Sequence, residues 1–218
     1  MPLAPKAVLE PRKSPVQARS TASVSAILEA TIQVLLDVGK ERLTTTRVAY
    51  RAGVSVGTLY QYFPNKSALL QATLKNHLES VADAVDLVCR EQRGSPAVQM
   101  VTRLVDTFLE AKMKDIKTSV TLYSVSSDVE GSKIAAKTAL RINKAIASML
   151  ATAREPLEKD PQLVASIVQA AMAGVSRRLL ESASPEKNLE PLKQELLLML
   201  RSYLDASIAR DGNQGPAR

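Results

Sequence analysis

Residues 44–70 read TTTRVAYRAGVSVGTLYQYFPNKSALL and contain two short candidate helices joined by a glycine turn. The Thr44 hydroxyl can accept a hydrogen bond from the free amides at the start of a helix over 45–52. Gly53 suits the positive φ of a tight turn, and Pro64 ends a second short helix over 56–63. Two short helices that meet at such a turn predict a helix-turn-helix.

The sequence on both sides of this stretch is typical of amphipathic helices. Before it, residues at 3-4 spacing form one face of a helix from Thr21 to a stop at Gly39: Val24, Ile27, Leu28, Thr31, Ile32, Leu35 and Val38. After it, the pattern predicts helices over 66–93, 97–112, 131–154, 161–183 and 187–210. Residues 116–129 keep helical spacing, but their Val-Thr-Leu-Tyr-Ser-Val run also suits a strand.

These patterns predict an all-α protein with an N-terminal three-helix helix-turn-helix domain over 21–66 and a larger C-terminal helical domain over 67–210. Residues 1–20, with four prolines and no apolar period, are predicted to form a flexible basic tail, and 211–218 a disordered C-terminus. Arg12, Lys13 and Arg19 make the tail either a solvated segment or an arm that touches DNA.

Charge and cysteine content narrow the class of protein. Of the 218 residues, the first 66 hold nine of the 29 Lys and Arg but only four of the 22 Asp and Glu, so the positive excess predicts a polyanionic partner there. Cys89 is the single cysteine, which excludes an intrachain disulfide and fits a reducing compartment. The longest uncharged run, 161–176, is too short to span a bilayer. We therefore expect a soluble, cytoplasmic protein with no membrane partner.

Residues 44–70 strongly resemble the DNA-binding region of the TetR family of bacterial transcriptional regulators. The Thr-rich helix start, Ala-Gly-Val-Ser turn, Gly-Thr-Leu-Tyr, Tyr-Phe and Asn-Lys-x-x-Leu-Leu elements of that family occur here in order. The resemblance covers roughly residues 21–75, and the remainder is similar only in length and helical pattern. It implies a DNA-binding N-terminal domain and a C-terminal domain that dimerises and encloses an inducer pocket.

The resemblance also implies which residues contact DNA. Thr44 and Thr45 would place hydroxyls and helix-start amides at a phosphate, while Val56 and the Thr58 methyl would touch a thymine methyl. The predicted DNA-binding residues are Thr44, Thr45, Thr46, Arg47, Ser55, Val56, Gly57, Thr58, Tyr60, Gln61, Tyr62 and Lys66.

Several of these side chains also have a structural interpretation. Thr44 serves equally as a helix cap, Arg47 and Arg51 suit a solvated surface, and Tyr50 suits either a core edge or a DNA contact. The predicted recognition helix carries no Arg, the commonest reader of guanine. We therefore expect affinity to depend on phosphate contacts and groove shape, and to fall steeply with salt.

The C-terminal domain carries candidates for a dimer interface and for a ligand pocket. A stripe of small residues and an apolar seam on the final helix predict a four-helix interface between two chains: Ser166, Ala170, Ala173, Gly174, Leu192, Leu196, Met199 and Tyr203. The alternative is that both helices pack only within the monomer. The predicted pocket residues are His77, Met100, Leu104, Phe108, Met113, Tyr123 and Met149, which also suit an ordinary core.

The function that these features favour is a homodimeric, sequence-specific DNA-binding regulator, a repressor released from a palindromic operator by an unknown small-molecule inducer. No cofactor or metal is expected, because one His and one Cys give little for a metal site. An enzyme is the first alternative. The sequence argues against it, because it contains neither a suitable nucleophile pair nor a phosphate-binding glycine motif. The second is a helical ligand-binding or interaction protein that does not use its DNA-binding motif.

Overall fold

A computed structural model describes residues 15–208. The chain divides into two compact units after Thr73, rather than after residue 66 as predicted. We call residues up to 73 the N-terminal unit and those from 74 the C-terminal unit. Most of the predicted basic tail and the predicted disordered C-terminus lie outside the described residues.

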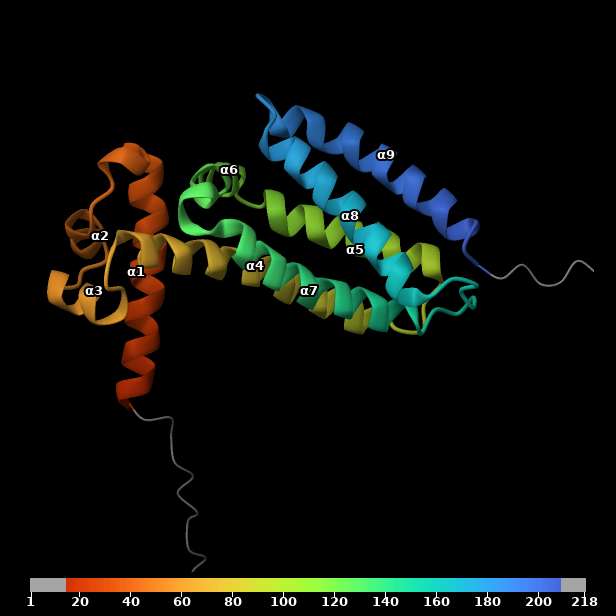
Figure 1. The fold of residues 1–218 in the computed structure, drawn as a ribbon, viewed down its shortest axis with the longest axis horizontal. Helices are drawn as coiled ribbons and strands as arrows, with labels where there is room; N and C mark the ends of the chain where they lie inside the picture. The colour runs from red at the N-terminus through yellow and green to blue at the C-terminus, as the bar shows by residue number, and fades with distance from the viewer. Residues whose placement is uncertain (1–14, 209–218) are drawn as a thin grey trace, which may run out of the picture. The chain divides into compact units, whose positions relative to one another are not determined.

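The N-terminal unit consists of α1 (Pro15–Arg42), α2 (Thr45–Arg51), α3 (Val56–Tyr62) and the start of α4 (Lys66–Glu91). Helix α1 begins at Pro15, six residues before the predicted start at Thr21, because proline is tolerated in a first helical turn. Its regular geometry ends at Gly39, where φ is 74°. Helix α2 packs against both α1 and α3, as Figure 1 shows. The largest fully buried side chains of the unit are Ile27, Leu35, Leu43, Leu59 and Leu69.

The turn between α2 and α3 explains the glycine at position 53. Helix α2 ends in a Schellman motif, in which the Gly53 amide donates to the Tyr50 carbonyl at 3.2 Å and the Val54 amide to the Ala49 carbonyl at 3.0 Å. This motif requires a left-handed residue after the helix cap, and Gly53 supplies it with a φ of 67°. The predicted helix-turn-helix is therefore confirmed.

The C-terminal unit holds the rest of α4 with α5 (Ala97–Met113), α6 (Ile116–Val125), α7 (Gly131–Leu150), α8 (Pro161–Leu180) and α9 (Pro185–Asp205). Helix α8 packs against α7 and α9, and α9 also packs against α5 (Figure 1). Between α9 and α5, the Lys193 ammonium lies 2.7 Å from an Asp106 carboxylate oxygen. The all-α fold is confirmed over the described residues, whose only β pairing is an isolated bridge between Leu157 and Ile208.

The segment that suited either a helix or a strand is helical. Asp115 caps α6, because its carboxylate accepts a hydrogen bond from the Thr118 amide at 3.0 Å. Thr118, Ser119, Leu122 and Val125 are buried together, which is the spacing of one helix face and not of a strand. A 3-10 helix, Ser126–Val129, continues the chain to α7.

Helices α7, α8 and α9 end three to five residues before their predicted ends at 154, 183 and 210. Hydrogen bonds between residues three apart tighten the chain after α7: the Thr152 amide donates to Met149 at 2.9 Å and the Ala153 amide to Leu150 at 3.0 Å. Such bonds satisfy the last helical carbonyls and end the helix. The spacing of apolar residues does not predict where these three-residue hydrogen bonds begin, so it does not locate the end of the helix.

Candidate functional site

Both short helices of the N-terminal unit begin with a hydroxyl cap. The Thr44 hydroxyl accepts from the Arg47 amide at 3.2 Å, and the Ser55 hydroxyl accepts from the Thr58 amide at 2.9 Å. The Ser55 and Thr58 hydroxyls also lie 2.8 Å apart. These contacts satisfy amides that would otherwise lack partners at the helix starts. Thr44 and Ser55 are exposed, so a phosphate can approach both helix starts from outside.

Helix α3 buries one face and leaves the opposite face exposed. Leu59 is fully buried, whereas Val56 is 37% and Tyr60 47% exposed. Gly57 and Gln61 are also exposed, so the predicted base-reading residues share the outer face. A Cβ placed at Gly57 would meet only the Ser55 hydroxyl, at 3.7 Å. Nothing in the described part of the unit covers this face of α3.

One hydrogen bond joins the two short helices at their exposed side. The Thr45 hydroxyl lies 3.1 Å from the Tyr60 hydroxyl. A phenol held in this way keeps its apolar ring at a fixed position on α3, and either oxygen retains a lone pair for a further donor. Thr46 and Arg47 are exposed beside this contact, and no described side chain pairs with the Arg47 guanidinium.

Three residues take positions that the sequence did not settle. The Lys66 ammonium donates to the Lys40 carbonyl at 2.8 Å and is half-buried, so it helps hold α4 to the end of α1. Tyr50 is 89% exposed, which excludes the core-edge interpretation. The Arg51 guanidinium pairs with the Asp37 carboxylate on α1, so it is not simply solvated.

The C-terminal unit encloses a cavity of about 510 Å³ between α4, α5, α6, α7 and α8. Of the predicted pocket residues, His77, Phe108 and Tyr123 line it. Met100, Leu104, Met113 and Met149 are buried in the core and do not line this cavity. Helical spacing shows that a side chain faces inward, but not whether another side chain or a void meets it. Much of the wall comes from residues that the sequence did not single out, among them Leu78, Val81, Ala135, Thr138, Ala139, Gln169 and Met172.

A small polar cluster lies at one part of this wall. The Ser119 hydroxyl donates to the Lys112 carbonyl at 2.6 Å and lies 3.2 Å from His77 Nε2. Because a hydroxyl has one proton to donate, His77 must donate from Nε2 in this arrangement. Burial, and next the positive charge of Lys112, lower the pKa of His77, so the ring is neutral at pH 7. Burial also lowers the pKa of the Lys112 ammonium.

The other charged groups of the cavity wall have partners. The Glu130 carboxylate lies 2.9 Å from the Lys133 ammonium, and the Arg177 guanidinium lies 2.9 Å from the Glu181 carboxylate. The Tyr123 hydroxyl also donates to Glu181 at 2.7 Å, which raises the pKa of Tyr123. These neighbouring pairs contribute little net charge to the cavity.

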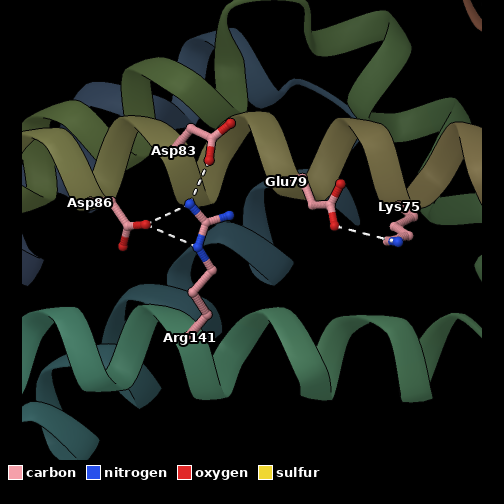
Figure 2. A network of polar contacts seen from close by, with 5 residues as sticks. All are labelled: Lys75, Glu79, Asp83, Asp86 and Arg141. Carbon is pink, nitrogen blue, oxygen red and sulfur yellow. Dashed lines mark hydrogen bonds and ion pairs between the residues drawn. The ribbon is translucent and has the colours of Figure 1, made fainter. Parts of the chain in front are cut away.

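Helices α4 and α7, which form two walls of the cavity, are joined by a charged clamp (Figure 2). From α7, Arg141 Nη2 reaches Asp83 Oδ1 and Asp86 Oδ2 on α4, both at 2.5 Å. The Nε atom of Arg141 also donates to Asp86 at 2.9 Å. The spacing of Asp83 and Asp86 within α4 does not show that α7 places an arginine between them.

The exposed face of α8 and α9 departs from the predicted dimer interface. Ser166, Ala170, Ala173, Gly174 and Met199 are exposed, as an interface requires. Leu196, in contrast, is only 2% exposed and belongs to the core of its own unit. Leu192 and Tyr203 are partly buried against that core as well. Three further large apolar side chains on the two helices are exposed and lie outside the predicted interface: Leu163, Ile167 and Leu198.

Comparison with known proteins settles the family. Residues 27–73 match the family model described as "Bacterial regulatory proteins, tetR family", and residues 96–204 match the model described as "Tetracyclin repressor-like, C-terminal domain". The second match alone covers half of the chain. The chain belongs to the TetR family. Members of this family are DNA-binding transcriptional regulators and not enzymes, so the predicted family and class are confirmed.

Curated TetR-family relatives match over the DNA-binding region. The HTH-type transcriptional regulator BetI of Cronobacter sakazakii is 39% identical over 59 residues, which are 27% of this chain and 29% of that protein. BetI of Escherichia coli (strain K12) is 37% identical over 59 residues, or 30% of its length. The match thus spans less than a third of these relatives.

Solved structures of other regulators share the fold at low identity. A TetR-family regulator from Mesorhizobium loti has a TM-score of 0.69 at 16% identity and covers 88% of this chain and 99% of its own. The fatty acid degradation regulator FadR from Bacillus halodurans has a TM-score of 0.61 at 18% identity and covers 86% of this chain and 97% of its own. At these identities the likeness shows the fold.

Two helices of this TetR-family chain are long and apolar enough to cross a membrane by length and composition, Ser20–Arg42 and Pro161–Leu180. This is weak evidence for a membrane protein, because a core helix of a soluble protein passes the same test. The family's regulators are soluble, and Pro161–Leu180 and most of Ser20–Arg42 lie within the residues that match the family models.

Proposed function

We propose that this chain is a cytoplasmic, homodimeric repressor that binds a near-palindromic operator and is released from it by a small molecule. Each N-terminal unit would address one half-site, with α3 in the major groove and half-sites roughly 34–36 Å apart. The alternative, a helical ligand-binding protein that does not use its DNA-binding motif, predicts no operator.

The observation that carries the proposal is the uncovered outer face of α3. Val56, Gly57, Tyr60 and Gln61 are exposed there, although Leu59 between them is fully buried. A glycine and a valine at the start of this helix allow the backbone to approach base edges closely, and the amide of Gln61 can pair with a base edge. The exposed Arg47, together with the capped starts of α2 and α3, supports contacts to phosphates.

The exposed apolar residues of α8 and α9 support dimerisation. Leu163 and Ile167 lie one turn apart on α8, and Leu198 and Met199 lie on α9. Gly174 has open space around its Cα, with nothing within 4 Å of a Cβ placed there, so a partner helix can approach closely. We propose this face as the interface in place of the part of the seam formed by Leu192, Leu196 and Tyr203, because these side chains are buried or partly buried against the core of their own unit.

Helix α4 supports a coupling between ligand and operator. Its first turns belong to the N-terminal unit, and its Leu74, His77, Leu78 and Val81 line the cavity of the C-terminal unit. A ligand that prefers one arrangement of the cavity walls therefore acts on a helix that continues into the DNA-binding unit, and its differential affinity sets how far operator binding shifts.

The test is selection of DNA from a random library by the purified protein, followed by binding measurements on the selected site. Gln61→Ala is expected to weaken binding roughly 5- to 150-fold, which corresponds to about 1–3 kcal/mol for a base contact. Leu140→Ala, which changes an exposed side chain on α7, is the control and leaves binding unchanged. A folded dimer that selects no palindrome at low salt favours the ligand-binding alternative.

The dimer is tested separately by sedimentation velocity. Leu198→Asp is expected to shift the protein towards monomer, because it places a charge in an apolar contact. The same substitution at Leu140, which is also exposed and apolar but lies on α7, leaves the dimer intact. A wild-type monomer at micromolar concentration would overturn the dimer.

A further inference from the structure

We propose that the cavity of the C-terminal unit binds a small organic monocarboxylate with an apolar body, and that Lys112 is the residue that pairs with its carboxylate. This inference rests on the proposed ligand-responsive function and names the chemical class of the ligand. It follows from the shape of the cavity and from a count of the charges in its wall.

The cavity has the size and lining of a site for an organic molecule. Its volume of about 510 Å³ lies within the range of roughly 300–1,000 Å³ that is typical of pockets for such ligands. Much of the wall is apolar and comes from five helices: Leu74, Leu78, Val81, Phe108, Leu122, Ala135, Ala139, Ile142, Met172 and Leu180. A wall of this kind gains free energy by covering an apolar body.

Lys112 is the uncompensated charge of this wall. Among the described residues, Glu130 is paired with Lys133 and Arg177 with Glu181, but no side chain accepts a hydrogen bond or ion pair from the Lys112 ammonium. His77 beside it is neutral, so it neither repels nor balances the lysine. The nearby Asp115 carboxylate is exposed and is occupied in capping α6, where it accepts from the Thr118 amide and hydroxyl.

Burying an ammonium without a partner costs free energy, which a bound anion recovers. The lysine is half-buried and its pKa is lowered by burial, so it pays this cost in the unliganded protein. A cationic ligand would add to the cost, and a neutral one would leave it unchanged.

The charge count also favours a carboxylate over a phosphate. One ammonium balances one negative charge, whereas a phosphate monoester carries roughly 1.5 to 2 negative charges at pH 7. The wall provides no second unpaired cation among the described residues, because Arg177 is held by Glu181. When one oxygen of a ligand carboxylate pairs with Lys112, the other oxygen of the carboxylate can accept a hydrogen bond from a neighbouring polar group.

The experiment is calorimetric titration of the full-length protein with four ligands of equal chain length, kept below their micelle-forming concentrations: decanoate, decan-1-ol, decylamine and decyl phosphate. We expect decanoate to bind roughly 10- to 150-fold more tightly than decan-1-ol, which corresponds to one hydrogen bond to a charged group. Decylamine and decyl phosphate are expected to bind more weakly than decanoate. Equal or tighter binding of any of the three, or no binding of decanoate, would overturn the proposal.

Matched variants test the role of the lysine. Lys112→Met keeps the length of the side chain and removes its charge, so decanoate affinity should fall to that of decan-1-ol while decan-1-ol binding is unchanged. Lys114→Met, at the exposed lysine two residues later, is the control and should change neither. Lys112→Arg should retain the preference for decanoate. Unchanged decanoate binding in Lys112→Met would contradict the assignment, and the ligand ranking in the wild type decides the matter if that variant does not fold.

The same preparation is tested for binding to its selected DNA without ligand. Operator binding without decanoate binding would overturn the ligand class and leave the proposed regulator intact. Decanoate binding without operator binding would overturn the proposed regulator and leave the ligand class intact.

Discussion

The clamp between α4 and α7 gives a stability prediction whose size follows from the structure. Arg141→Met removes the charge and keeps an apolar stem of similar length. It leaves Asp83 and Asp86 without their shared cation, whose Nη2 atom lies 2.5 Å from a carboxylate oxygen of each. The hydrogen bonds to Asp83 and then to Asp86 raise the pKa of Arg141, which agrees in sign with a stabilising contact.

Screening by solvent limits the free energy that the clamp contributes to stability. A pair of unit charges 4 Å apart attracts by about 4 kcal/mol at an effective dielectric constant of about 20, but exposed pairs contribute about 0.2–1 kcal/mol in practice. Arg141 is 43% and Asp83 67% exposed, whereas Asp86 is only 19% exposed. The Asp83 contact therefore belongs at the low end of that range and the Asp86 contact at or above the high end. We expect the variant to lose about 1–2 kcal/mol of the free energy of unfolding.

The assay is thermal unfolding at fixed protein concentration, because the stability of a dimer depends on concentration. A loss of this size lowers Tm by about 2–8 °C for a chain of this length. The difference should shrink in 1 M salt, where the Debye length is about 3 Å. A double-mutant cycle with Asp86→Asn should give a coupling energy of about 1 kcal/mol.

Two variants serve as comparators. Lys137→Met removes an exposed cation one turn earlier on α7, and Lys75→Met breaks the looser pair with Glu79 at 3.6 Å that Figure 2 also shows. Each should cost less than about 0.5 kcal/mol. If Arg141→Met unfolds at the same temperature as Lys137→Met, or if the cycle shows no coupling, the reasoning is wrong.

Three further predictions concern a titrating ring, a thiol and a glycine. The pKa of His77 is lowered from 6.5 in the folded protein, so the unfolded chain binds more protons as the pH falls below 6.5, and the stability present above that pH should be lost. His77→Asn should therefore flatten the drop in urea midpoint between pH 7.5 and 5.5, and an unchanged slope would count against this. Burial, and then the charge of Asp86, raise the pKa of the Cys89 thiol to about 12, so a thiol reagent should label it slowly in the native protein and promptly in denaturant; equal rates would show that the thiol is accessible. A Cβ at Gly131 would lie 2.6 Å from a backbone carbonyl oxygen, so Gly131→Ala should cost about 1–3 kcal/mol in chemical denaturation. Gly57→Ala, which meets only a hydroxyl at 3.7 Å, should cost far less, and equal costs would refute the clash.

The DNA-binding unit could be predicted closely because its signals are local. A cap at Thr44, a positive-φ turn at Gly53 and a stop at Pro64 act on their immediate neighbours, so the bounds of α2 and α3 agree with prediction to within a residue. The family resemblance depends on the same residues. The sequence did not show that Lys66 donates to the Lys40 carbonyl, because that contact joins residues far apart in the chain.

The packing of the C-terminal unit could not be predicted from the sequence alone. Its helices could be predicted from their apolar spacing, which states only that a side chain faces inward. Whether it then meets another side chain, a cavity or a second chain depends on how helices distant in sequence pack together. That is why Met100 lies in the core, Leu196 is covered within its own unit, and Lys112 lines a cavity between five helices. The sequence determined the fold and the family. The tertiary structure decided where a cavity for a ligand lies and which charged side chain of its wall has no partner among the described residues.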